Sequence, residues 1–191
     1  MGKGRLEAFS DGVIAVIITI MVLEMHVPHG GDLAALQTAL PAFLSYIFSF
    51  VYIGIYWNNH HHMLHATRHV NGAVLWANLH LLFWLSLVPF ATAWMGENHF
   101  ASTPVAVYGF ALLMPGFAYT ILQRQIVALE GPESLLATAV GQDLKGKLSL
   151  VLYIAGIPLA FVSPWISGAL YVLVAVMWFI PDRRIEDRVT H

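Results

Sequence analysis

Long apolar segments constrain this chain more than any other feature of its sequence. Each is long enough to cross a bilayer as a helix, which takes about 20 residues at about 1.5 Å of rise per residue. The sequence therefore predicts an all-α integral membrane protein in which residues 1–191 form a single six-span transmembrane domain. The predicted spans are Leu6–Val27, Leu36–His62, Ala73–Met95, a segment from Pro104 to about Gln125, and two within Leu148–Ile180.

Composition agrees with a membrane protein and excludes several function classes. Only 10% of the 191 residues are charged and 58% are hydrophobic, whereas soluble domains carry about 25% charged residues. The net charge of −2 and the lack of a basic stripe argue against nucleic-acid binding. With no cysteine, disulfides, thiol nucleophiles and cysteine-ligated metals are excluded. The first apolar segment has no small-residue cleavage site, so we expect it to remain as a helix and not to be removed as a signal peptide.

The last apolar region, Leu148–Ile180, is too long for one span. Ser163-Pro164 divides it, because the residue before a proline is driven out of the α region. The sequence therefore favours two short spans here. The alternative is one long kinked helix, which would give five spans in total.

The positions of the basic residues favour six spans over five. All nine Lys and Arg lie at the N-terminus, after the second and fourth segments, or at the C-terminus. Six crossings with both termini cytoplasmic place all of them inside, as the positive-inside rule requires. Five crossings would leave the C-terminal arginines outside. We therefore expect a multi-pass protein of the cell membrane with both ends in the cytoplasm.

The first segment presents two different surfaces when it is projected at about 100° per residue. Ser10 and Asp11 fall off the main stripe, and Asp11 lies nearly opposite, so this acid needs a partner inside the protein. Glu24, near the outer end and about 80° off the stripe, either concentrates cations at a mouth or is a solvated helix end. The stripe itself consists of Arg5, Phe9, Gly12, Val16, Thr19, Ile20, Leu23 and Val27.

A histidine-rich stretch ends the second segment and raises the possibility of a metal site. Iron centres of membrane hydroxylases use several histidine boxes on different helices, and His80 is the sole further intramembrane candidate here. We therefore prefer a cluster at the membrane interface, with a buried contact between Asp11 and either His60 or His61. The alternative function is a membrane metalloenzyme built on His60, His61, His62, His65 and His80. A secondary transporter is disfavoured, since no inverted repeat is visible.

Several motifs resemble the transmembrane protein 175 family of lysosomal and prokaryotic potassium channels. Arg5-x-x-x-Phe9-Ser10-Asp11 looks like the signature at the head of the family's first helix. The similarity runs in order through the first three segments, whereas the last three match in hydropathy and length alone. Its other parts are Tyr56-Trp57-Asn58-Asn59-His60-His61, Asn78-Leu79-His80-Leu81-Leu82-Phe83 and Leu87-Val88-Pro89-Phe90-Ala91-Thr92.

This resemblance implies a homotetramer in which four copies of the first helix line a central pore in the lipid bilayer. It implies passive, potassium-selective conduction, no enzymatic activity, and no cofactor or metal beyond the permeant potassium ion. Constriction rings would come from Val16, Thr19 and Leu23, all of which lie on the stripe. The family's narrowest ring is usually Ile or Leu, so Val16 predicts a wider neck. The residues implied to hold the pore helix are Arg5, Phe9, Ser10, Asp11, Trp57, His60, His61 and Asn78.

Overall fold

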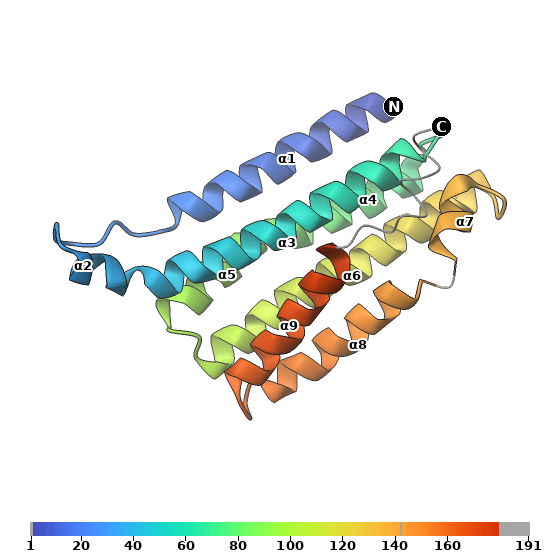
Figure 1. Ribbon diagram of the computed structural model, residues 1–191. Helices are drawn as coiled ribbons and strands as arrows, with labels where there is room; N and C mark the ends of the chain where they lie inside the picture. Colours follow the sequence, from blue (N-terminus) through green and yellow to red (C-terminus); the bar gives the residue numbers. More distant parts are fainter. Residues whose placement is uncertain (1, 142, 180–191) are drawn as a thin grey trace.

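The computed structural model describes residues 2–141 and 143–179, and every regular element in this part of the chain is an α-helix. The helices form one bundle, with α1 along one edge, α8 along the opposite edge, and α3, α4, α6 and α9 between them (Figure 1). The prediction of an all-α fold is therefore confirmed for this part. The bounds are α1 Lys3–Leu23, α2 Leu33–Thr38, α3 Leu40–His65, α4 Gly72–Ser86, α5 Val88–Glu97, α6 Ser102–Glu130, α7 Leu135–Val140, α8 Leu144–Leu159 and α9 Pro164–Phe179.

Among the described residues, four helical segments are long and apolar enough to cross a membrane. They are α1, α3, the consecutive pair α4 and α5, and α6. The second segment differs from its predicted start at Leu36, because a separate short helix, α2, precedes α3. Pro41 lies in the first turn of α3, where the missing backbone donor costs little. Pro89 has the same place in α5, so the third segment is two helices where one was expected.

The last apolar region contains two helices, not one long kinked helix. α8 ends at Leu159 and α9 begins at Pro164, which is where Ser163-Pro164 predicts a break. The two helices lie side by side (Figure 1), and the Ser167 hydroxyl of α9 donates to the Gly156 carbonyl of α8 at 2.6 Å. Each has 16 residues, which gives a length of about 24 Å. Ile180, the last residue of the predicted final span, lies outside the described residues.

Two clusters of buried apolar side chains stabilise the bundle. The first joins α1 to α3, α4 and α6, and the second joins α3, α5, α6, α8 and α9. Tyr171 of α9 is at the centre of the second cluster, between Gly109 of α6 and Gly156 of α8. A Cβ atom at Gly109 would lie 1.9 Å from the Tyr171 hydroxyl oxygen, so any larger residue there would force this tyrosine to move. The buried apolar side chains of α1 belong to the first cluster. Among the described residues, the second cluster contains none from α1, and we call the helices that it joins the scaffold.

Candidate functional site

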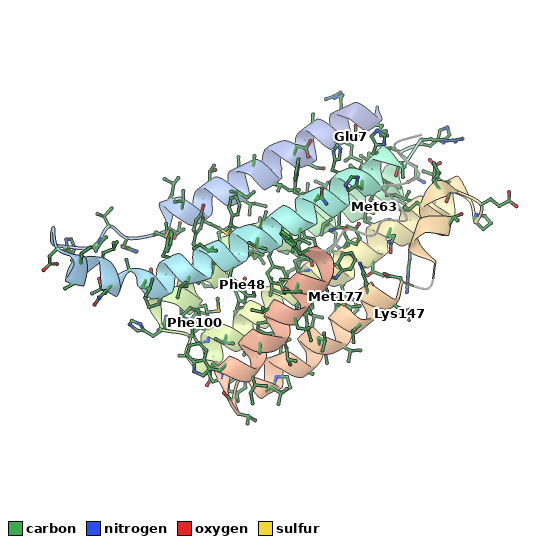
Figure 2. The ribbon with its side chains drawn as sticks, in the orientation of Figure 1. Glu7, Phe48, Met63, Phe100, Lys147 and Met177 are labelled. Atoms are coloured by element: carbon green, nitrogen blue, oxygen red, sulfur yellow. The ribbon has the colours of Figure 1, made fainter. Side chains whose placement is uncertain are left out.

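Helix α1 has one buried face and one exposed face. The buried residues are Leu6, Ser10, Ile14, Ile17 and Met21, which recur every three or four residues as one side of a helix does. The stripe residues from Arg5 to Leu23 lie on the other face and are exposed, whereas Val27, also exposed, lies beyond the end of α1. Val16 is 54% exposed and Leu23 is 79% exposed, although both are apolar. Side chains project from this side of α1 away from the rest of the bundle (Figure 2).

Thr19 places an oxygen atom between the two apolar side chains of this face. Its hydroxyl donates to the Val16 carbonyl, one turn back, at 2.9 Å. A hydroxyl has one donor and two acceptor lone pairs, so the donor is used within the helix and the lone pairs remain. The exposed face of α1 therefore presents a hydroxyl oxygen with free lone pairs between Val16 and Leu23.

A chain of three buried side chains connects α1 to α4 and α3. Asn78 Nδ2 donates to Ser10 Oγ at 2.9 Å, and His60 Nε2 lies 2.7 Å from Asn78 Oδ1. Ser10 in turn donates to the Leu6 carbonyl at 2.8 Å. Since an amide oxygen only accepts, His60 must carry its proton on Nε2 in this arrangement. All three side chains are at most 1% exposed, so loss of one partner leaves a buried polar group unsatisfied.

The partner of Asp11 differs from the prediction. Trp57 Nε1 donates to Asp11 Oδ1 at 3.1 Å, while His60 binds Asn78. We predicted a contact between Asp11 and His60 or His61, and the hydrogen bond of this carboxylate goes to Trp57 instead. His61 stacks on the Trp57 ring at a centroid distance of 6.0 Å, so it contributes to this group through the tryptophan. The side chain of α3 that reaches the acid comes one helical turn before the expected histidines.

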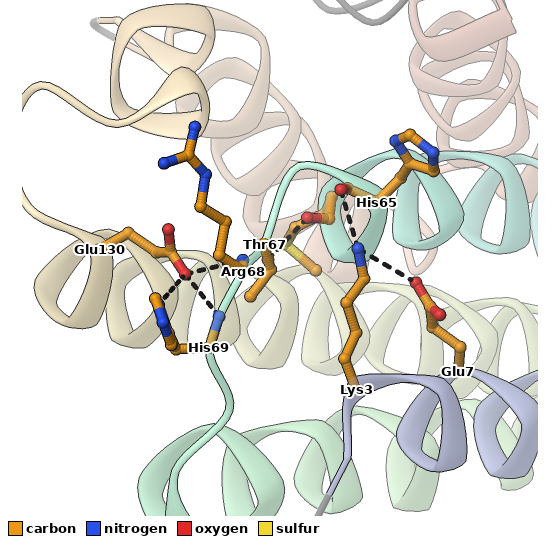
Figure 3. A network of polar contacts seen from close by, with 8 residues as sticks. Lys3, Glu7, His65, Thr67, Arg68, His69 and Glu130 are labelled. Atoms are coloured by element: carbon orange, nitrogen blue, oxygen red, sulfur yellow. Dashed lines mark hydrogen bonds and ion pairs between the residues drawn. The ribbon is translucent and has the colours of Figure 1, made fainter.

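Lys3 adds a contact that the sequence did not indicate. Its Nζ donates to the His65 carbonyl at 2.9 Å and lies 3.7 Å from Glu7 Oε1 (Figure 3). The last carbonyls of a helix have no intrahelical partner and carry partial negative charge, so a lysine is favourable there. The N-terminal turn of α1 is thereby bonded to the C-terminal turn of α3.

The loop between α3 and α4 is bonded to the end of α6 at the same end of the bundle. Glu130 Oε1 accepts from the backbone N–H groups of Arg68 and His69, each at 2.7 Å (Figure 3). Its side chain is 8% exposed. This carboxylate therefore connects the α3–α4 loop to the C-terminal end of α6, at the end of the bundle that is predicted to face the cytoplasm.

The remaining predicted site residues lie apart from these contacts. Arg5 and Phe9, predicted to help hold α1, lie on its exposed stripe. Glu24 is exposed at the C-terminal cap of α1. Nearby, His26 Nδ1 lies 3.3 Å from Glu97 Oε1, which connects the segment after α1 to the end of α5.

The histidines of the alternative metal site do not converge. His60 is bonded to Asn78, and His80 accepts from Trp84 Nε1 at 2.8 Å. His61 is in ring contact with His62 and His65 along α3. Within residues 2–141 and 143–179, no group of three or more histidine or acidic side chains is arranged to hold a metal ion. The geometry therefore gives the metalloenzyme alternative no site in this part of the chain.

Known proteins resemble this chain along almost its whole length. A family model described as the endosomal/lysosomal potassium channel TMEM175 matches residues 5–89. A potassium channel of Chryseobacterium sp. (strain P1-3) is 58% identical over 186 residues, which is 97% of each chain. A potassium channel of Streptomyces collinus (strain DSM 40733 / Tue 365) is 31% identical over 187 residues, covering 92% of this chain and 91% of that one.

A solved structure extends the likeness to the second half of the bundle. The crystal structure of a lysosomal potassium-selective channel TMEM175 homologue from Chamaesiphon minutus matches with a TM-score of 0.83 and 28% identity, covering 94% of this chain and 97% of that one. These relatives are channels, which agrees with the prediction that the chain is not an enzyme. With its several long apolar helices, the chain is a multi-pass membrane protein and belongs to the TMEM175 family.

Proposed function

We propose that this protein is a potassium-selective channel, a homotetramer in which four copies of α1 surround a central pore. The observation that carries the proposal is the exposed face of α1. Its side chains Val16, Thr19 and Leu23 do not pack against the rest of the chain. Four such faces around an axis would cover the apolar side chains and enclose a conduit. The relatives that share this chain's length are potassium channels, which supports potassium as the ion. Conduction would be passive and would need no cofactor.

The proposed pore has an oxygen ring between two apolar rings. A hydrophobic constriction passes partly dehydrated cations and closes by dewetting. The Val16 ring is wider than an isoleucine or leucine ring would be. The Thr19 ring replaces part of the lost hydration, since its lone pairs are free of the helix. Glu24 would raise the cation concentration at the outer mouth.

The bonds on the buried face of α1 set which side chains face the axis. Ser10, Asn78 and His60 fix the rotation of α1 about its own axis, and Asp11 with Trp57 adds a second contact. A slip by one residue would turn the helix by about 100° and carry Thr19 out of the pore. Arg5 and Phe9 lie on the exposed side of the entrance turn, so the support proposed for them would come through contacts with neighbouring subunits.

The proposed topology has six spans and both termini in the cytoplasm. The spans are α1, α3, α4 with α5, α6, α8 and α9, and residues 1–191 form one domain. Lys3 and the Arg68 backbone lie at the same end of the bundle (Figure 3), and Arg124 and Lys147 face one pocket near it. This distribution follows the positive-inside rule and supports a place in the cell membrane.

Flux through reconstituted protein tests the proposal. Vesicles containing the purified chain should release potassium down its gradient without ATP or a second ion. Val16→Lys should abolish cation flux and Val16→Ala should increase it, because the first places charge in the neck and the second widens it. Val22→Ala is the matched control on α1, since Val22 is exposed but lies off the stripe. Flux that is the same in all three variants would overturn the pore assignment.

A further inference from the structure

A pocket of about 430 Å³ opens between α6, α7 and α8, far from α1. Arg124 of α6 and Lys147 of α8 both line it, together with Gln123 and Thr120. Its volume is within the range of small-ligand sites, about 300–1,000 Å³. Figure 2 shows Lys147 on α8 beside α7, at the edge of the molecule opposite α1.

The pocket carries net positive charge. Neither Arg124 nor Lys147 belongs to an ion pair in the described part of the chain. The acid in the pocket, Asp143, is turned toward the first turn of α8, where Oδ1 accepts from the Gly146 N–H at 3.2 Å. Two cations lining one pocket favour a phosphate group as the ligand.

An exposed apolar stripe begins beside the same pocket. Leu144 is 69% exposed, Leu148 48% and Val151 61%. Lys147 follows Leu144 by three residues and precedes Val151 by four, so these side chains lie on one side of α8. Because α8 lies at the edge opposite α1 (Figure 1), this stripe faces lipid if α1 faces a central axis.

We propose that Arg124 and Lys147 bind the phosphate of an anionic phospholipid whose acyl chains lie along Leu144, Leu148 and Val151. A basic pocket between membrane helices at the predicted cytoplasmic surface is suited to an anionic headgroup. A free phosphate ion would use the two cations and gain nothing from the apolar stripe. Because the basic pocket and the apolar stripe adjoin each other on α8, a ligand with both a phosphate and acyl chains fits them better than a free phosphate ion does.

Native mass spectrometry of the whole purified protein with added phosphatidylglycerol or phosphatidylcholine of identical acyl chains tests this proposal. The protein should retain phosphatidylglycerol in preference. The double variant Arg124→Gln/Lys147→Gln should bind it roughly tenfold more weakly, because each basic residue near an anionic surface contributes on the order of a few-fold in affinity. The matched control is Arg68→Gln/Lys145→Gln, which removes the same charge outside the pocket lining and should bind nearly as the unmodified protein does.

The outcomes separate the alternatives. Equal losses in the two double variants would show a general charge effect and overturn the site, as would equal binding of the two lipids. Displacement of the lipid by millimolar inorganic phosphate would identify a phosphate site and overturn the choice of a lipid. A melting temperature close to that of the unmodified protein checks that the double variant is folded. If the double variant does not fold, the single variants Arg124→Gln and Lys147→Gln test the same claim, and each should lose less lipid binding than the double variant would.

Discussion

Two buried polar networks stabilise this bundle, and they differ in what they connect. The network of α1 runs from Ser10 through Asn78 to His60, so one asparagine joins α1 to α3. The scaffold network is centred on Ser49 of α3, whose hydroxyl lies 2.7 Å from Thr92 Oγ1 and 2.8 Å from the Tyr108 hydroxyl. Ser49 therefore has two side-chain partners, whereas Ser10 depends on Asn78 alone for its contact with another helix.

Tyrosines extend the scaffold network to the last two helices. The Tyr52 hydroxyl donates to the Tyr171 carbonyl of α9, and Tyr153 of α8 donates to the Tyr52 hydroxyl at 3.2 Å. These groups lie within the second apolar cluster. Several helices thus fix one another redundantly, while the orientation of α1 rests on a few side chains. We therefore expect removal of one hydrogen bond to destabilise the scaffold less than it destabilises the attachment of α1.

Loss of Asn78 should have the largest effect. Asn78→Leu leaves both the Ser10 hydroxyl and the His60 imidazole buried without that partner, and each unsatisfied group costs about 1–3 kcal/mol. We expect the free energy of unfolding to fall by about 3 kcal/mol, measured by thermal unfolding in detergent. Asn59→Ala is the control, since Asn59 Nδ2 donates within its own helix to the Ile55 carbonyl. Equal destabilisation by the two variants would remove the special role of Asn78.

Gly109→Ala should be the most damaging single change within the scaffold. The added methyl would meet the Tyr171 hydroxyl, and Gly156 also lies close to this ring, which restricts its movement. Overpacking of this kind costs about 1–3 kcal/mol. Gly168→Ala is the control, because nothing lies within 4 Å of a Cβ there. Similar melting temperatures for the two variants would contradict the packing around Tyr171.

Ser10→Ala and Tyr108→Phe compare the two networks directly. Ser10→Ala leaves the buried Asn78 amide without that acceptor and should cost about 1–3 kcal/mol, whereas Tyr108→Phe leaves Ser49 bonded to Thr92 and should cost about 1 kcal/mol. Potassium flux should change in Ser10→Ala, because α1 loses a bond that sets its rotation, and should be unchanged in Tyr108→Phe. If flux responds equally in both, the attachment of α1 has no separate role.

Asp11→Asn should have the smallest effect. The asparagine keeps a carbonyl oxygen that can accept from Trp57 Nε1, so the change weakens a charge-assisted bond by less than about 1 kcal/mol. We expect fewer assembled oligomers, counted by mass in detergent, with the potassium preference of the remaining channels unchanged. Intact oligomers with altered ion preference would place Asp11 in the pore.

The sequence predicted the division of α1 into two faces, because residues three and four apart lie on one side of a helix and burial follows the same period. It predicted the break between α8 and α9 for a similarly local reason, the restriction that Pro164 places on Ser163. It failed for the partner of Asp11, since the register between α1 and α3 decides whether Trp57 or His60 reaches the carboxylate. Contacts to backbone groups, such as Lys3 with the His65 carbonyl, were missed because any residue can supply a carbonyl.

Cysteine modification tests the central claim most directly, since the chain has no cysteine of its own. Thr19→Cys and Leu23→Cys would be treated with a charged thiol reagent while potassium flux is recorded, with Lys145→Cys at the polar start of α8 as the control away from α1. The account predicts that modification blocks flux through both α1 variants and leaves the control unchanged. Unblocked flux in both modified α1 variants, with labelling verified by mass, would contradict a pore lined by the exposed face of α1.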